Sequence, residues 1–380
     1  MTFEPVRPVD VTGIGPLLKY CNWPNTAGSY QTTVMTDADI FASQRVLSIQ
    51  SHVVSGYAGN KAATFPLQTL GYDVDVLNIL QFSNHTGYPS WGGKRISPEE
   101  IQDLFDGLKK NGLMDEYTHI LTGYIGNAAT LETCVKAIRE IKESRKGVIY
   151  VCDPVMGDDG SLYVSSEVIP LYRSIAGLAD VITPNQTEAE ALANTKIETL
   201  SDAQETIQHL HQLGAPHVII TSVHLPQQDV PKQLIVNPQS DKALVCIGSS
   251  ILENGQTKQF LVSFPTFQGY FTGTGDMFSA LVVARLTEQL KTANESDDDL
   301  SPLAQAIFKV VLTLNAVTEK TWKRQKEYVK LQKGEEASDI EGKPDSASLI
   351  RQCELMVIQG KQAIENPHLF ARDEIKVVMI

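Results

Sequence analysis

The 380-residue sequence has no uninterrupted apolar run close to the ~18 residues that a membrane-spanning helix needs. Its first residues, MTFEPVRPVDVTGIG, carry acids, little arginine and no long apolar run, so they fit neither a secretory signal nor a mitochondrial presequence. The five cysteines are scattered without a CxxC pair, which argues against disulfides and zinc sites. We therefore expect a cytoplasmic protein, which could also occur in the nucleus, with no membrane partner.

The sequence is also short of positive charge, with 32 Lys and Arg against 45 Asp and Glu and a net charge of −13. A surface this acidic repels the phosphate backbone of nucleic acids, so we expect no nucleic-acid partner. An anionic nucleotide could still bind through local backbone N–H groups, metal ions and a few cationic side chains.

Apolar strands alternate with helical segments between residues 45 and 222. The helix predicted for SPEEIQDLFDGLKKNG has Ser97 as its N-cap and Pro98 at its first position. Strands that are apolar throughout are typical of a parallel sheet covered on both faces. The later runs QLIVN, ALVCIGS and QFLVSFP predict antiparallel strands near one edge. The pattern predicts an α/β fold, a three-layer αβα sandwich with a mainly parallel central sheet and antiparallel edge strands.

Three parts of the chain depart from this alternation. Residues 1–44 have a mixed polar composition without clear periodicity, and we expect an N-terminal extension that is disordered in part. Two charged segments, near 293–301 and 333–348, have little to bury and are interpreted as acidic insertions. We expect residues 45–380 to form a single domain that contains both insertions.

The stretch FTGTGDMFSA, residues 271–280, combines a glycine turn with the start of a helix. Glycines allow backbone N–H groups to approach a phosphoryl group there, and the helix N-terminus favours negative charge. Asp276 at this place could accept a proton from an attacking hydroxyl. The alternative is an ordinary acidic residue at a helix start, and the letters GTGD alone favour that alternative.

Two further signals also follow predicted strands, where parallel α/β sheets place their ligands. In CDPVMGDDG, the oxygens of Asp153, Asp158 and Asp159 would suit magnesium or a monovalent cation, and the alternative is a solvated acidic loop. Asp153 is the best candidate of the three because it lies at the strand end. In TPNQTEAE, Asn185 and Glu188 could face phosphate oxygens and a magnesium-bound water, or could form a helix capping box.

Two polar turns follow the first two predicted strands. QFSNHTGY, residues 81–88, holds His85, which is more often structural than catalytic in such a turn. SHVVSGYAGN, residues 51–60, begins with Ser51, whose hydroxyl could bond a heterocyclic nitrogen or simply cap the turn.

Taken together, these segments resemble one family. RVLSIQSHVVSGYAGNKAATFPLQTLGYDVD, QFSNHTGY, LTGY, VCDPVMGD, ITPNQTEAE, VIITS and GTGDMFSA occur in the order and spacing found in the pyridoxal kinases of the ribokinase-like superfamily. The resemblance covers residues 45–290 closely and the remainder more loosely. It implies ATP-dependent phosphorylation of the 5′-hydroxymethyl group of pyridoxal, pyridoxine or pyridoxamine. It also implies Mg²⁺ or another divalent ion, a monovalent cation (K⁺ or Na⁺) and a homodimer.

The resemblance also implies roles for individual residues. Asp276 would be the base that takes the hydroxyl proton. The pyridoxal pocket would be formed by Ser51, Phe82, His85, Thr86, Tyr124 and Asp276. The nucleotide site would be formed by Asp153, Asn185, Glu188, Thr221, Ser222, Gly273, Thr274, Gly275 and Phe278. The cations would lie at Asp153, Asp158, Thr183, Thr221 and Glu188.

Two alternatives stand beside this interpretation. A hydroxymethylpyrimidine or sugar kinase of the same superfamily is one, although hydroxymethylpyrimidine kinases often carry cysteine where this chain has Asp276. A non-catalytic protein that binds pyridoxal phosphate on the same fold is the other. Such a protein would be expected to lack the base or the glycine turn, and this sequence has both.

Overall fold

The computed structural model describes residues 44–252, 254–292, 300–334, 340 and 342–380. The predicted N-terminal extension therefore lies outside the described residues, except for Gln44. Residues 293–299 of the first predicted acidic insertion, and residues 335–339 and 341 of the second, also lie outside them.

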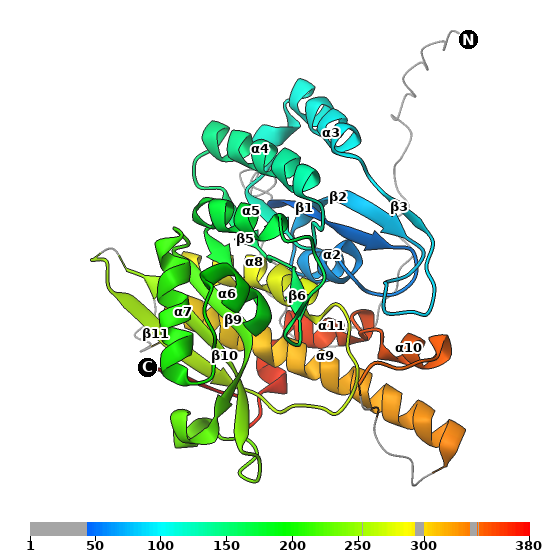
Figure 1. Ribbon diagram of the computed structural model, residues 1–380, viewed down its shortest axis with the longest axis vertical. Helices are drawn as coiled ribbons and strands as arrows, with labels where there is room; N and C mark the ends of the chain where they lie inside the picture. Colours follow the sequence, from blue (N-terminus) through cyan, green and yellow to red (C-terminus); the bar gives the residue numbers. More distant parts are fainter. Residues whose placement is uncertain (1–43, 253, 293–299, 335–339, 341) are drawn as a thin grey trace, which may run out of the picture. The chain divides into compact units, whose positions relative to one another are not determined.

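The described chain contains one ten-stranded sheet, in the order β12-β11-β10-β9-β8-β5-β4-β1-β2-β3 (Figure 1). Six neighbouring strands in its centre run parallel. They are β1 (Arg45–Val53), β2 (Asp73–Phe82), β4 (His119–Thr122), β5 (Ile149–Cys152), β8 (Val181–Ile182) and β9 (His217–Pro226).

The edge strands of the sheet are antiparallel to their neighbours. They are β3 (Gly93–Arg95) at one edge, and β10 (Lys242–Ile251), β11 (Thr257–Ser263) and β12 (Lys376–Met379) at the other. The prediction of a mainly parallel sheet with antiparallel edge strands is confirmed.

Helices cover both faces of the sheet (Figure 1). One face packs against α3 (Pro98–Lys110), α4 (Ala128–Ser144), α5 (Val168–Ile175), α6 (Gln186–Ala193) and α7 (Leu200–Gln212). The other face packs against α2 (Asn60–Thr69), α8 (Thr274–Thr292), α9 (Pro302–Lys333) and α11 (Lys361–Glu365). A further helix, α10 (Ala347–Cys353), packs on α9.

The central strands contribute to both apolar cores. In β1, Leu47 and Ile49 pack into the core under α3 to α7, whereas Val46 packs into the core under α2, α8 and α9. Alternate side chains of a strand point to opposite faces, so a strand buried on both faces is largely apolar, although β1 also buries Ser48 and Gln50. The αβα sandwich thus follows directly from the composition of these strands.

Several short elements connect the main ones. A two-stranded hairpin of β6 (Gly157–Asp158) and β7 (Ser161–Leu162) follows β5. The described 3₁₀ turns are η2 (Leu113–Glu116), η3 (Ala176–Leu178), η4 (Gln227–Asp229), η5 (Lys232–Leu234), η6 (Ile358–Gly360) and η7 (Pro367–Phe370).

The strand predicted for QLIVN, residues 233–237, is wrong. The 3₁₀ turn η5 occupies its first part, and the chain then runs as a loop into β10. Pro231 and Pro238 flank the run, and a proline has no N–H to donate to a β-ladder. Leu234 is nevertheless buried, so the apolar pattern reflects burial rather than strand pairing.

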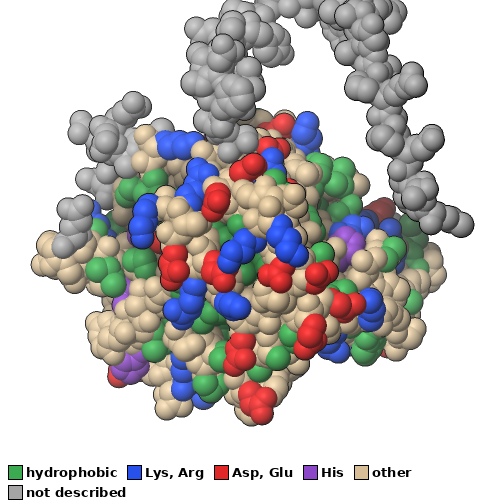
Figure 2. Space-filling view, turned by 90° about the horizontal axis from the view of Figure 1, so that it is seen from above, with side chains coloured by type: hydrophobic (Ala, Val, Ile, Leu, Met, Phe, Trp, Pro, Cys, Tyr) green, Lys and Arg blue, Asp and Glu red, His purple; other side chains and the backbone are tan. Residues whose placement is uncertain are grey.

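None of the described helices is long and apolar enough to cross a membrane. Figure 2 shows one face of the molecule, on which Lys and Arg side chains lie among Asp and Glu side chains. The negative charge of the sequence is therefore not gathered into a single acidic patch on that face.

Candidate active site

Three carboxylates meet at the carboxyl edge of the parallel strands: Asp153, Glu188 and Asp276, which we call the carboxylate cluster. Asp153 follows β5, whereas Glu188 and Asp276 lie in the first turns of α6 and α8. Asp153 and Glu188 are only 4% and 3% exposed. Burial raises the pKa of Asp153 well above its ordinary value, and the charges of Glu188 and Asp276 raise it further. Buried carboxylates that repel one another are typical of functional sites.

Glu188 is held by backbone N–H groups from the start of α6 and from the loop after β5. Its Oε2 accepts a hydrogen bond from Asn185 N at 2.8 Å, and its Oε1 accepts one from Met156 N at 2.9 Å. Asn185 Oδ1 in turn accepts from Glu188 N at 2.9 Å, so the capping box is present. Burial nevertheless raises the pKa of Glu188 to about 7, although these N–H groups oppose the shift. A cation nearby would therefore favour its ionised form.

The glycines before Asp276 bring the start of α8 close to two other segments. Gly273 has φ +86°, and a Cβ at this position would lie 2.3 Å from the carbonyl oxygen of Tyr57. Only glycine tolerates both this left-handed backbone and this close approach. A Cβ on Gly275 would lie 3.6 Å from Asp153 Oδ2. The GTGD turn is therefore adjacent to the carboxylate cluster.

Asp276 is anchored by a backbone group from a distant part of the chain. The N–H of Gly59 donates to Asp276 Oδ2 at 2.7 Å. Burial raises the pKa of Asp276, and this hydrogen bond partly offsets the shift. A Cβ on Gly59 would lie 2.4 Å from Ser51 Oγ, so Ser51 lies beside the same turn. Gly59 is absent from the predicted site residues, although the letters YAGN mark a turn of close backbone approach.

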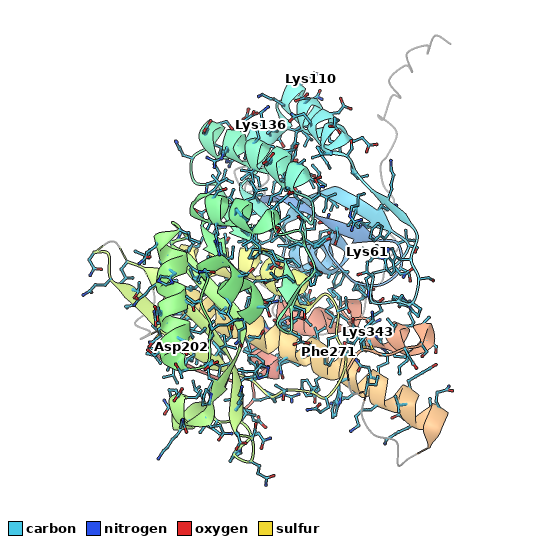
Figure 3. All side chains as sticks on the ribbon, in the orientation of Figure 1. Lys61, Lys110, Lys136, Asp202, Phe271 and Lys343 are labelled. Carbon is cyan, nitrogen blue, oxygen red and sulfur yellow. The ribbon has the colours of Figure 1, made fainter. Side chains whose placement is uncertain are left out.

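The turn of residues 54–59 packs over the start of α2. Lys61 Nζ donates to Val54 O at 2.9 Å and lies 5.8 Å from the centre of the Tyr57 ring. Figure 3 labels Lys61 at the start of α2 and Phe271 on the segment that leads into α8. These contacts close the turn, which orients the Gly59 N–H toward Asp276.

Two buried side-chain oxygens near the cluster lack a hydrogen-bond partner in the described part of the chain. They are Asp153 Oδ2 and Thr183 Oγ1. Hard oxygen atoms of this kind suit Mg²⁺ and monovalent cations. Among the described residues, no group of three or more His, Cys, Asp and Glu side chains is placed to hold a metal ion. Mg²⁺ commonly binds through one or two carboxylates together with substrate phosphates, so the residues present fit such an ion.

The strand β9 has a bulge where two predicted site residues lie. Val223 pairs with Val245 and Ile220 pairs with Ile247, so Thr221 and Ser222 together face a single residue of β10. A bulge of this kind changes the direction of side chains at a sheet edge. The backbone N–H of Thr221 donates to Pro184 O at 3.0 Å, which ties this bulge to the segment that precedes α6.

Four of the residues predicted for the pyridoxal pocket lie at or after the ends of β2 and β4. Phe82, the last residue of β2, is 7% exposed, and His85 is 8% exposed. Thr86 is exposed, whereas Tyr124 is half-buried.

Tyr163 is a neighbour of this pocket that the sequence pattern does not predict. Its ring centre lies 6.3 Å from that of Tyr124. The Tyr163 side chain is 56% exposed, but partial desolvation of its hydroxyl, together with the charges of Glu188 and Asp153, raises the pKa of that hydroxyl. Tyr163 comes directly after the hairpin strand β7, which has no periodic signal of its own.

Three predicted residues lie in surroundings that sequence alone does not indicate. Phe278 is 3% exposed and packs in the apolar core between α8 and the sheet. Asp158 is exposed, and its Oδ1 accepts from Asp159 N at 3.0 Å. Asn185 uses its side-chain amide to donate to Gly157 O at 2.7 Å. The predicted ligand contacts of these three residues therefore stay predictions.

The fold and the site together define a small-molecule kinase of the ribokinase-like class. In agreement, the family described as phosphomethylpyrimidine kinase matches residues 113–297. The pyridoxal kinase of Arabidopsis thaliana is 39% identical over 332 residues, which are 87% of this chain and 94% of that protein. The human pyridoxal kinase is 36% identical over 86% of this chain and 96% of its own length. The chain therefore belongs to the pyridoxal kinase family.

Solved structures agree with this assignment. The pyridoxal kinase of Leishmania donovani in complex with ADP and pyridoxamine has a TM-score of 0.71 and 33% sequence identity. It covers 89% of this chain and 100% of the Leishmania chain. The same protein in complex with ADP and pyridoxine has a TM-score of 0.70, at 88% and 99% coverage.

Proposed function

We propose that this chain transfers the γ-phosphoryl group of ATP to the 5′-hydroxymethyl group of pyridoxal, pyridoxine or pyridoxamine. With pyridoxal the product is pyridoxal 5′-phosphate, which makes the reaction a step of vitamin B6 salvage. Membership of the pyridoxal kinase family supports this activity. Within the chain, the observation that carries the proposal is the GTGD turn, which brings Asp276 together with Asp153 at the carboxyl edge of the sheet.

Asp276 acts as the general base in this proposal. A primary alcohol is a weak nucleophile, so a carboxylate within reach of the hydroxyl proton assists its attack. The raised pKa of Asp276 makes it a better proton acceptor than an ordinary surface carboxylate. The Gly59 N–H fixes one carboxylate oxygen, which orients the side chain. The backbone N–H groups of residues 273–275 stabilise charge on the transferred phosphoryl group.

Two cations would complete the site. When bound, Mg²⁺ and K⁺ or Na⁺ would neutralise phosphate charge. Asp153, Glu188 and Asp158 are the residues for the divalent ion. Thr183 and Thr221 are the residues for the monovalent ion, and the unpartnered Oγ1 of Thr183 supports this choice.

The remaining residues line the two substrate sites. Pyridoxal would contact Ser51, Phe82, His85, Thr86 and Tyr124. The nucleotide would contact Asn185, Ser222, Gly273, Thr274, Gly275 and Phe278. Residues 45–380 would work as one domain, and two copies of the chain would form a homodimer in the cytoplasm.

A substrate panel tests the proposed function. Purified protein with ATP, MgCl₂ and KCl would be given pyridoxal, pyridoxine, pyridoxamine or hydroxymethylpyrimidine, and ADP formation would be measured. We expect kcat/KM for at least one of the three B6 compounds to exceed that for hydroxymethylpyrimidine by about 100-fold, because a site built to bond a given ring rejects analogues that leave its polar groups unpaired. The match to the phosphomethylpyrimidine kinase family makes hydroxymethylpyrimidine the relevant competitor. A preference for it would overturn the proposal.

A further inference from the structure

Glu354 is a buried carboxylate that lies outside the predicted site but contacts the segments that build it. It follows α10 and is 2% exposed. Its Oε2 accepts a hydrogen bond from Tyr57 N at 2.7 Å, and its Oε1 accepts one from Tyr88 Oη at 3.0 Å. The same Oε1 lies 3.3 Å from His85 Nε2. A residue near the C-terminus thus binds two loops through contacts that span 297 and 266 positions of sequence.

The polar contacts of His85 indicate which tautomer its ring adopts. Gly87 N donates to His85 Nδ1 at 3.1 Å, so Nδ1 is an acceptor and Nε2 carries a proton toward Glu354. The rings of His85 and Tyr88 also lie 4.8 Å apart between their centres. The loop that carries Thr86 is therefore tied to Glu354 through the residues on either side of it.

The contact with Tyr57 acts on the other loop, the turn of residues 54–59. The same turn supplies the Gly59 N–H that holds Asp276. Gly56 in this turn has φ +99°, and a Cβ there would lie 2.2 Å from Glu354 Oε1. The turn therefore needs glycine at this position in order to pack against the carboxylate.

A third segment, which leads into the GTGD turn, also meets Glu354. Thr272 forms a parallel β-bridge with Glu354. Arg324 donates to the main-chain carbonyl of Glu354 and to that of Gln352, which fixes the backbone here. Burial alone would raise the pKa of Glu354, but hydrogen bonds from His85 and Tyr57 lower it below its ordinary value, so the side chain stays ionised.

We propose that Glu354 is a positioning residue that holds the loop of His85 and Thr86, the turn that anchors Asp276 and the segment before the GTGD turn in one arrangement. The proposal rests on the proposed function, because it concerns how these segments present substrate to the base. Glu354 itself would not touch the reacting atoms. Its carboxylate would set the geometry in which pyridoxal binds.

The substitution Glu354→Gln tests the charge and the acceptor pattern at nearly constant shape. An amide has one acceptor oxygen, and its NH₂ group would face either the Tyr57 N–H or the donors Tyr88 and His85. One of the two loops therefore loses its partner. Gln352→Ala is the matched control, since the Gln352 side chain donates to Ser348 O within its own helix.

We expect Glu354→Gln to raise KM for pyridoxal about tenfold or more, while KM for ATP changes less than about twofold and kcat falls less than KM rises. Gln352→Ala should leave all three values unchanged. Thermal unfolding of each variant reports whether it is folded. A folded Glu354→Gln variant with unchanged KM for pyridoxal, or one in which both KM values rise equally, would overturn the proposal.

Tyr88→Phe provides a second test that removes one donor and leaves the carboxylate in place. We expect it to raise KM for pyridoxal about threefold, and to add little when combined with Glu354→Gln, because both changes break the same contact. No effect of Tyr88→Phe would contradict the inference even if Glu354→Gln failed to fold. Where both variants fold, full additivity would contradict it as well. Wild-type activity toward pyridoxal and its loss in Asp276→Ala test the proposed function separately.

Discussion

Two groups of buried ionisable side chains lie at different places in the sheet, and they differ in how well they are partnered. At the start of β4, His119 is 2% exposed. Its Nδ1 lies 2.8 Å from Thr118 Oγ1, and its Nε2 lies 2.8 Å from Thr287 Oγ1. At the carboxyl edge, Asp153 is also buried, but its Oδ2 has no partner among the described residues.

The difference separates a structural group from one that we propose binds a ligand. Both nitrogens of His119 are hydrogen-bonded, and burial lowers its pKa to about 4, so the neutral ring is a stable part of the core. In the carboxylate cluster, burial and neighbouring acids raise the pKa of Asp153 and oppose its ionisation, which a bound cation would favour. Burial alone therefore does not mark a functional residue, whereas an unmet partner in a cluster of carboxylates makes Asp153 a candidate.

The largest effect on activity is expected from substitution of Asp276, the proposed general base in the carboxylate cluster. Asp276→Ala should lower kcat at least about 100-fold, because it removes the proton acceptor. Binding of ATP analogues should stay nearly unchanged, since the GTGD backbone remains. Turnover and nucleotide affinity measured on the same preparation test this prediction. Unchanged turnover would make Asp276 an ordinary helix-start residue.

Asp153→Asn is expected to lower activity less than Asp276→Ala does. It is also expected to raise the stability of the metal-free protein. The amide keeps the shape and removes the repulsion from Glu188 and Asp276, so the metal-free protein should unfold at a higher temperature. Activity should fall by about tenfold or more, and the Mg²⁺ concentration for half-maximal activity should rise. Thermal scans without metal and Mg²⁺ titrations measure the two effects. A lower unfolding temperature would show that Asp153 is a stabilising residue like His119.

Substitution of His119 should instead lower stability and leave activity nearly unchanged. His119→Ala removes both ring contacts and leaves a cavity, so the free energy of unfolding should fall by about 2 kcal/mol. The ring also meets Tyr72 edge-on with 5.5 Å between centres, and this packing is lost as well. Turnover of the folded variant should stay within about twofold of wild type. Chemical denaturation and steady-state kinetics check the prediction, and a large loss of turnover would contradict it.

Local patterns in the sequence account for the architecture and for most of the carboxylate cluster. The apolar strands of residues 45–222 predict the parallel sheet, and the carboxyl ends of parallel strands meet at one edge. Asp153 and Glu188 follow two such strands, β5 and β8, so their meeting is predictable from the sequence. Asp276 starts the helix after the antiparallel strand β11, and the GTGD turn is what marks it. The strand predicted for QLIVN fails because the flanking prolines matter more than the apolar letters.

Contacts between distant segments could not be predicted in this way. Glu354 meets Tyr57 across 297 positions, and the letters RQCELMVIQG carry no period or motif that marks it. Gly59 reaches Asp276 across 217 positions through a backbone N–H, a group that every residue except proline has. Such contacts depend on the packed fold, whereas motifs report only the residues near them in sequence.

The smallest effect concerns how the stability of the protein without metal and nucleotide depends on pH. The folded-state pKa of Glu188, about 7, is above its ordinary 4.5. The contribution of Glu188 to the free energy of unfolding is therefore fully present below pH 4.5 and is lost as pH rises through 7. The folded-state pKa of His119, about 4, is below its ordinary 6.5, so its contribution is lost as pH falls from 6.5 toward 4. Each slope is at most ~1.4 kcal/mol per pH unit, and the two oppose each other between pH 4.5 and 6.5.

Relative to wild type, Glu188→Gln should therefore gain stability as pH rises from 4.5 to 6.5, whereas His119→Ala should lose stability over the same range. Thermal unfolding of the three proteins from pH 4.5 to 8 measures both slopes, and parallel curves would show that neither group titrates as its burial requires.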